Sequence, residues 1–82
     1  MRALFVGGTV DNSELDLGVR EQPPVHYPEN TGSGQSRYRL HSAHRHEGRL
    51  VYAVYAAPEL PESEVERVID ERDYARRFGA TH

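Results

Sequence analysis

Residues 37–57 read RYRLHSAHRHEGRLVYAVYAA and carry the strongest structural signal in the chain. Two runs of strand-forming residues flank the pair Glu47-Gly48, and a short polar and glycine-containing break between such runs is typical of a tight turn between antiparallel strands. We therefore predict a β-hairpin over residues 37–57.

The register of this hairpin decides which side chains share a face of the sheet. A three-residue turn that ends at Gly48 with a bulge pairs Leu40 with Val54 and His44 with Leu50. One face is then expected to carry Tyr38, Leu40, Tyr52 and Val54. The opposite face is expected to carry Arg37, Arg39, His41, Arg45, Val51 and Tyr55.

The residues before the hairpin predict further strands. An apolar run over residues 3–6 ends at Gly7-Gly8 and indicates a strand that is buried on both faces. Residues 14–17 alternate between polar and apolar after a turn, so the first third of the chain is expected to form a hairpin. Residues 25–27 suit a short edge strand, and residues 29–36 suit a mobile loop.

The residues after the hairpin predict one C-terminal helix that begins near residue 62, because Pro58 and Pro61 stop the sheet. Either Pro61 occupies its first turn, or a capping box over residues 63–66 starts it slightly later. One stripe of this helix, at helical spacing, carries Val65, Val68, Ile69 and Arg72. Tyr74 and Phe78 fall off that stripe. We expect them to cover the sheet edge after a kink near residue 73, or to form a self-association patch between subunits.

The whole chain, residues 1–82, is therefore expected to be a single α+β domain, with a small antiparallel β-sheet of about four strands and one C-terminal helix. Cysteine and lysine are both absent, which excludes thiol nucleophiles, disulfides and Schiff-base or P-loop lysines. No apolar run is long enough to span a membrane. We expect a cytoplasmic protein that does not act at a membrane.

His41, His44 and His46 form the most visible cluster of metal-binding side chains. His44 and His46 would project from one face of a strand, whereas His41 would lie on the other face. A zinc site needs at least three protein ligands, and no third ligand at a fixed spacing is visible. We therefore expect no metal and no cofactor. No catalytic residues are predicted either, because no hydroxyl group lies in a motif with a base and an orienting acid.

Charge is segregated along the chain although the net charge is only −3. Residues 37–49 hold four arginines and three histidines against Glu47, and residues 59–73 hold seven acidic residues against two arginines. Arginine and tyrosine are favoured at interfaces. The predicted binding surface is therefore the hairpin face with Arg37, Arg39, Arg45 and Tyr55.

Two functions follow from this surface. The first is a non-catalytic protein-interaction or accessory module, which binds an acidic surface of a partner or a second copy of itself. The alternative is a weak single-stranded nucleic-acid binder, in which tyrosines stack bases and arginines contact phosphates. The negative net charge favours the first function, because nucleic-acid-binding domains are usually basic.

The order of features along the chain resembles small uncharacterised proteins of bacteria and their phages. These features are Gly7-Gly8 after a strand, the turn acid Asp11, Pro23-Pro24, Tyr38 opening a strand, Tyr52-x-x-Tyr55, and a proline-led acidic helix. Thr9 and Asn12 depart from the commoner G-G-P-x-D-G opening of that group. The resemblance implies an accessory protein of prophage origin and no particular activity.

Overall fold

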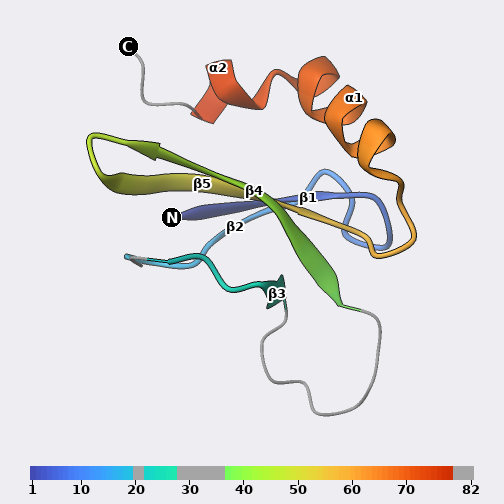
Figure 1. Ribbon diagram of the computed structural model, residues 1–82, viewed down its shortest axis with the longest axis horizontal. Coiled ribbons are helices and arrows are strands. Elements are labelled where there is room, and N and C mark those ends of the chain that lie inside the picture. The colour runs from blue at the N-terminus through green and yellow to red at the C-terminus, as the bar shows by residue number, and fades with distance from the viewer. Residues whose placement is uncertain (20–21, 28–36, 79–82) are drawn as a thin grey trace.

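The computed structural model describes residues 1–19, 22–27 and 37–78 (Figure 1). Within these residues the elements are β1 (Arg2–Val6), β2 (Glu14–Asp16), β3 (His26–Tyr27), β4 (Tyr38–His46), β5 (Arg49–Ala56), α1 (Glu62–Arg72) and α2 (Tyr74–Phe78). The predicted α+β class is confirmed. The mobile loop predicted over residues 29–36 lies outside the described residues.

The described strands form one mixed sheet in the order β2-β1-β5-β4-β3. β1 and β5 are parallel, with Phe5 opposite Tyr55, and the other neighbouring strands are antiparallel. The prediction of an antiparallel sheet of about four strands is therefore corrected to a mixed sheet of five. Hydrophobic pattern identifies β1 as a strand buried on both faces, but it does not give the direction of a neighbour that is distant in sequence.

The sheet has a buried cluster on each face. Both helices lie over one face (Figure 1), where they cover a cluster formed by Leu4, Val6, Tyr52, Val54, Ala56, Val65 and Tyr74. The opposite face buries Ala3, Phe5, Ala53 and Tyr55 against a partly buried set that includes Leu17, Tyr27, Tyr38 and Leu40. Alternate residues of β1 thus enter opposite clusters, which explains why its sequence is apolar throughout.

The predicted hairpin is confirmed, but its turn and register differ from the prediction. The turn has two residues, Glu47 (φ 52°) and Gly48 (φ 80°), and two successive positive φ angles define the tight turn that fits the twist of a hairpin. The register shifts at His41 on β4 and at Val51 on β5.

These two shifts change which side chains share a face. Leu40 pairs with Tyr55 rather than with Val54, and His44 pairs with Tyr52 rather than with Leu50. The predicted grouping of Tyr38 and Leu40 with Tyr52 and Val54 is therefore wrong. Tyr38 and Leu40 pack beside Tyr55, whereas Tyr52 and Val54 face the helices. An extra residue inverts the alternation of a strand, and composition does not reveal its position.

The C-terminal residues form two helical segments rather than one. α1 begins at Glu62 as predicted, and it ends where Asp73 adopts a left-handed conformation (φ 56°) and donates its N–H to the carbonyl of Asp70. This break rotates α2 so that Tyr74 enters the core with only 2% of its surface exposed. The change of direction predicted near residue 73 is confirmed.

One charged contact fixes the end of α1 against the turn that follows β1. Both Asp11 carboxylate oxygens accept hydrogen bonds from Arg72 Nη2, at 2.9 and 2.8 Å, and Oδ1 also accepts the Gly7 N–H at 2.7 Å. Arg72 Nη1 donates to the Tyr74 hydroxyl at 3.0 Å. The Gly7 N–H and the Arg72 guanidinium hold the pKa of the Asp11 carboxyl below its usual value.

Candidate functional site

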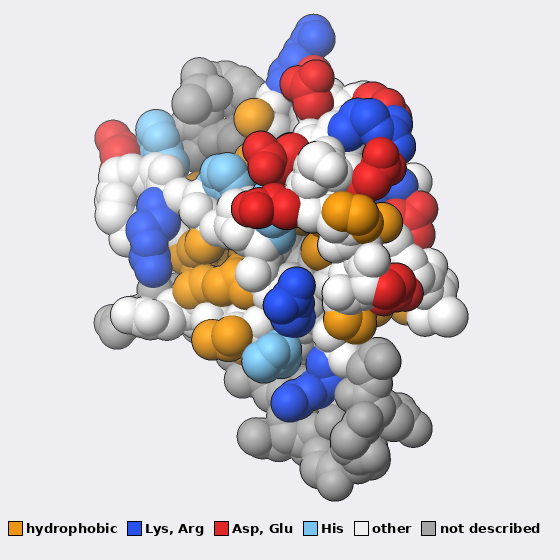
Figure 2. All heavy atoms as spheres, turned by 45° about the vertical axis from the view of Figure 1, so that its right-hand side comes forward, with side chains coloured by type: hydrophobic (Ala, Val, Ile, Leu, Met, Phe, Trp, Pro, Cys, Tyr) orange, Lys and Arg blue, Asp and Glu red, His pale blue; other side chains and the backbone are white. Residues whose placement is uncertain are grey.

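An open groove of about 440 Å³ runs between the β3–β4 edge of the sheet and the start of α1. Its wall combines apolar residues with two histidines, one arginine and one glutamate. The lining residues are Val25, His26, Arg39, Leu40, His41, Ala56, Leu60, Glu62 and Val65. Figure 2 shows this side of the molecule, where acidic side chains lie next to histidine and arginine side chains.

The cationic part of the groove comes from β3 and β4. Arg39 pairs with His26 across these strands, and Arg37 lies two residues earlier on the same chain segment. Arg39 is exposed and Arg37 is half-buried. Within the described part of the chain, neither Arg37 nor Arg39 forms an ion pair or a side-chain hydrogen bond. Their charges are therefore available to a ligand.

The other two residues of the predicted binding surface lie elsewhere. Tyr55 has no exposed surface, and its hydroxyl donates to the carbonyl oxygen of Pro24 at 2.7 Å. Arg45 pairs with Leu50 near the hairpin turn, at the opposite end of β4 from Arg37 and Arg39. The predicted four-residue surface is thus corrected to a pair of arginines, because the register shift at His41 places Tyr55 inside the core.

Tyr74 and Phe78 pack within the chain. Tyr74 belongs to the cluster under the helices, and the Phe78 ring lies 6.3 Å from the ring of Tyr52 between centroids. We predicted that this pair either covers the sheet within the chain or forms a contact between subunits. In the described residues the pair covers the sheet. Phe78 is half-buried, so part of its ring stays accessible.

The three histidines of the hairpin, His41, His44 and His46, lie in different surroundings. The His44 ring stacks on Tyr52 with centroids 4.3 Å apart, and its Nε2 lies 3.1 Å from Ser42 Oγ. Burial lowers the pKa of His44, and the nearby His41 lowers it further. A serine beside a neutral imidazole resembles part of a hydrolase site, but among the described residues no carboxylate contacts the ring to orient it.

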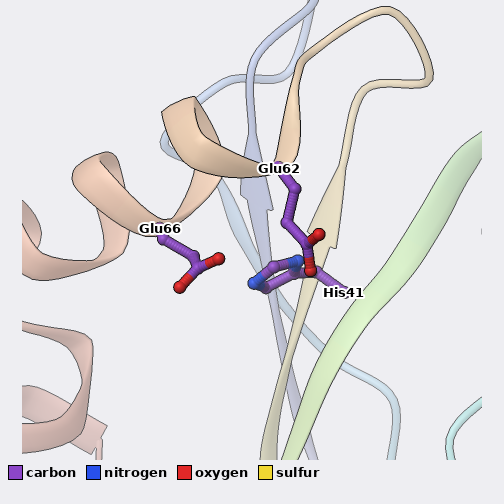
Figure 3. A group of neighbouring side chains, drawn as sticks. All are labelled: His41, Glu62 and Glu66. Atoms are coloured by element: carbon purple, nitrogen blue, oxygen red, sulfur yellow. The ribbon is translucent and has the colours of Figure 1, made fainter.

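His41 instead lies next to the acidic face of α1. Its imidazole and the carboxylates of Glu62 and Glu66 each offer a ligand atom, and these atoms all lie within 4.8 Å of one another (Figure 3). His41 is half-buried, and the two glutamates are exposed. The group stands at the rim of the groove, which His41 and Glu62 also line.

Sequence reasoning missed this group because it compared His41 only with His44 and His46. A partial signal existed in the spacing of Glu62 and Glu66, since residues four apart lie on one face of a helix. Nothing in the sequence places that helix face opposite His41, because the contact depends on how α1 packs over the sheet.

Comparison with known protein families, with curated proteins and with solved structures finds no match for this chain. Among the described helices, neither α1 nor α2 has the length and apolar character needed to cross a membrane. The groove and the charged groups around it are therefore the features of this chain that bear on its function.

Proposed function

We propose that this protein is a small non-catalytic protein-interaction module that binds an acidic, extended segment of a partner protein along the groove between β4 and α1. The observation that carries this proposal is the pair Arg37 and Arg39, which lack acidic partners in the described part of the chain. Arg39 lines a groove with apolar walls, and Arg37 lies two residues before it in the chain.

The unpaired state of these two arginines contrasts with that of four other arginines in the described part of the chain. Ion pairs join Arg2 to Glu14, Arg67 to Glu64 and Glu71, Arg72 to Asp11, and Arg76 to Asp73. Arg37 and Arg39 instead place two positive charges close together in the chain, and Arg39 pairs with His26 across β3 and β4. A carboxylate from a partner relieves this repulsion, and a guanidinium can hold it with two parallel hydrogen bonds.

The apolar walls supply the second half of an interface. Val25 is 66% exposed, and it lies at the groove with Ala56, Leu60 and Val65. Interfaces commonly combine an apolar centre with arginine at the rim. An extended segment with an apolar residue next to an acidic one would match both features of this groove.

The same features support a binding role over catalysis. Apart from tyrosines, no described polar or charged residue is buried, and the partly desolvated base His44 has no carboxylate partner among the described residues. The Ser42–His44 contact lacks an orienting acid. Nucleic-acid binding is the weaker alternative, because burial of Tyr55 removes one of the tyrosines expected to stack bases.

The test begins with cross-linking capture from the native host, followed by calorimetry with the purified partner. The decisive variant is Arg37→Gln/Arg39→Gln. Its matched control is Arg49→Gln/Arg76→Gln, which also removes two positive charges, one beside the hairpin turn and one in α2. We expect the first variant to lose at least tenfold in affinity, about 1.4 kcal/mol, and the control to stay within twofold.

Circular dichroism verifies that both variants remain folded. If the two variants bind the partner with equal affinity, Arg37 and Arg39 do not contribute specifically to binding. Tight, strongly salt-dependent binding of a short single-stranded oligonucleotide, lost in Arg37→Gln/Arg39→Gln, would favour the nucleic-acid alternative and overturn the proposal.

A further inference from the structure

We propose that His41, Glu62 and Glu66 form a binding site for a divalent transition-metal ion, with Zn²⁺ as the representative ion. The inference does not depend on the proposed interaction function. It rests on three potential ligand atoms from two different elements, β4 and α1, which lie within 4.8 Å of one another (Figure 3).

The electrostatic state of the two glutamates is the first argument. On the same helix, Glu64 and Glu71 both form ion pairs with Arg67. Glu62 and Glu66 have no ion pair or hydrogen bond within the described part of the chain. Two carboxylates held this close repel each other, and a cation between them removes that repulsion.

The spacing is the second argument. No direct ion pair joins the His41 ring to either carboxylate, so the three groups surround a gap rather than bond with one another. Around a zinc ion with bonds of about 2.1 Å, neighbouring ligand atoms of a tetrahedron lie about 3.4 Å apart. Small rotations of the two exposed glutamate side chains can bring the three ligand atoms from their present spacing to this tetrahedral separation.

The location of His41 is the third argument. His41 is the residue at which the register between β4 and β5 shifts, and such irregularities commonly aim a side chain away from the regular alternation of a strand. The strand backbone fixes one ligand, and the helix presents two more at the spacing of one turn. Metal binding would therefore join the start of α1 to the sheet.

The chemistry of the three ligand atoms indicates which metal ions the site would bind. One imidazole nitrogen and two carboxylate oxygens suit zinc and its first-row neighbours, whereas magnesium and calcium prefer sites made entirely of oxygen. Three protein ligands leave a fourth position for water or for a group from a partner. A carboxylate of a bound acidic segment is one such group.

Calorimetric titration of the untagged full chain with zinc chloride tests the site, because a histidine tag would bind zinc by itself. We expect saturable one-to-one binding that weakens at least tenfold in His41→Ala and in Glu62→Gln/Glu66→Gln. The matched controls, His46→Ala and Glu47→Gln/Glu59→Gln, should retain the wild-type affinity. Magnesium should bind at least tenfold more weakly than zinc.

Nuclear magnetic resonance of the imidazole groups gives an independent readout of the same site. Zinc should shift the His41 ring resonances at one equivalent, while those of His46 stay in place. The proposal is overturned if the wild-type chain binds no zinc, if His41→Ala binds as tightly as wild type, or if His46→Ala loses as much affinity as His41→Ala.

Discussion

Helix α1 contacts the rest of the molecule through charged groups at both ends, and the two ends behave differently. At the C-terminal end, Arg72 donates hydrogen bonds to both carboxylate oxygens of Asp11 and to the hydroxyl of Tyr74. At the N-terminal end, Glu62 and Glu66 approach His41 without bonding to it. The charge at the C-terminal end is therefore paired within the fold, whereas the charges at the N-terminal end are free to bind an external ligand.

This difference separates residues that stabilise the fold from residues that can bind. The Arg72 side chain is only 21% exposed, and it connects segments 61 positions apart in sequence. Such a contact strengthens the fold because its hydrogen bonds join charged groups and its arginine is partly shielded from water. Arg39, Glu62 and Glu66 are exposed and have no ion pair with any described residue, so their removal should cost little stability while it weakens binding.

The largest expected effect is the loss of stability in Arg72→Gln. This change removes the two hydrogen bonds to Asp11 and the bond to the buried Tyr74 hydroxyl, and we expect a cost of about 2 kcal/mol. A larger cost is not expected, because the Asp11 side chain is 43% exposed. Urea denaturation measures the effect.

The matched control for that experiment is Arg76→Gln. Arg76 is 84% exposed and lies 3.7 Å from Asp73, so the control should cost less than about 0.5 kcal/mol. If the two variants unfold at the same urea concentration, the distinction between the two ends of α1 would have no energetic basis.

A smaller effect is expected from the titration of His44. Burial lowers the pKa of this group below its ordinary value of 6.5, so the unfolded chain takes up a proton before the folded chain does as pH falls. Stability contributed by neutral His44 is therefore present above pH 6.5 and declines as pH falls toward the lower folded pKa.

Comparison of the wild-type chain with His44→Phe isolates the pH-dependent stability that His44 contributes. The variant keeps an aromatic ring against Tyr52 but cannot take up a proton. Thermal unfolding followed by circular dichroism from pH 7.5 to pH 5 should show a steeper fall of Tm in the wild-type chain. Equal slopes would show that His44 is not held in its neutral form by the fold.

Local signals in the sequence predicted much of the fold. The continuous apolar character of residues 3–6 identified β1, Glu47-Gly48 identified the hairpin turn, and Pro61 identified the start of α1. These signals depend on nearest neighbours and on turn chemistry. The parallel pairing of β1 with β5 has no such signal, because it joins segments that are about fifty residues apart.

The candidate site was predicted only in part, because it depends on register and on packing. Arg37 and Arg39 were predicted from local charge, and of the two Arg39 lines the groove. Tyr55 was misplaced, because the register shift at His41 inverts the alternation beyond it. The proximity of Glu62 to His41 required the position of α1 over the sheet, which no local pattern encodes.

The smallest expected effect in the absence of metal is that of Glu62→Gln/Glu66→Gln. Since neither carboxylate has a partner among the described residues, Tm in a chelator should stay within about 2 °C of wild type. In the same conditions Arg72→Gln should unfold at a clearly lower temperature.

The most direct test of the account is therefore the change in Tm that zinc produces in these three proteins. With free zinc at about ten times its dissociation constant, wild type and Arg72→Gln should each gain roughly 5–10 °C. Glu62→Gln/Glu66→Gln should gain nothing. An equal gain in Glu62→Gln/Glu66→Gln, or no gain in wild type, would contradict the claim that α1 leaves the charges of its N-terminal end to an external ligand.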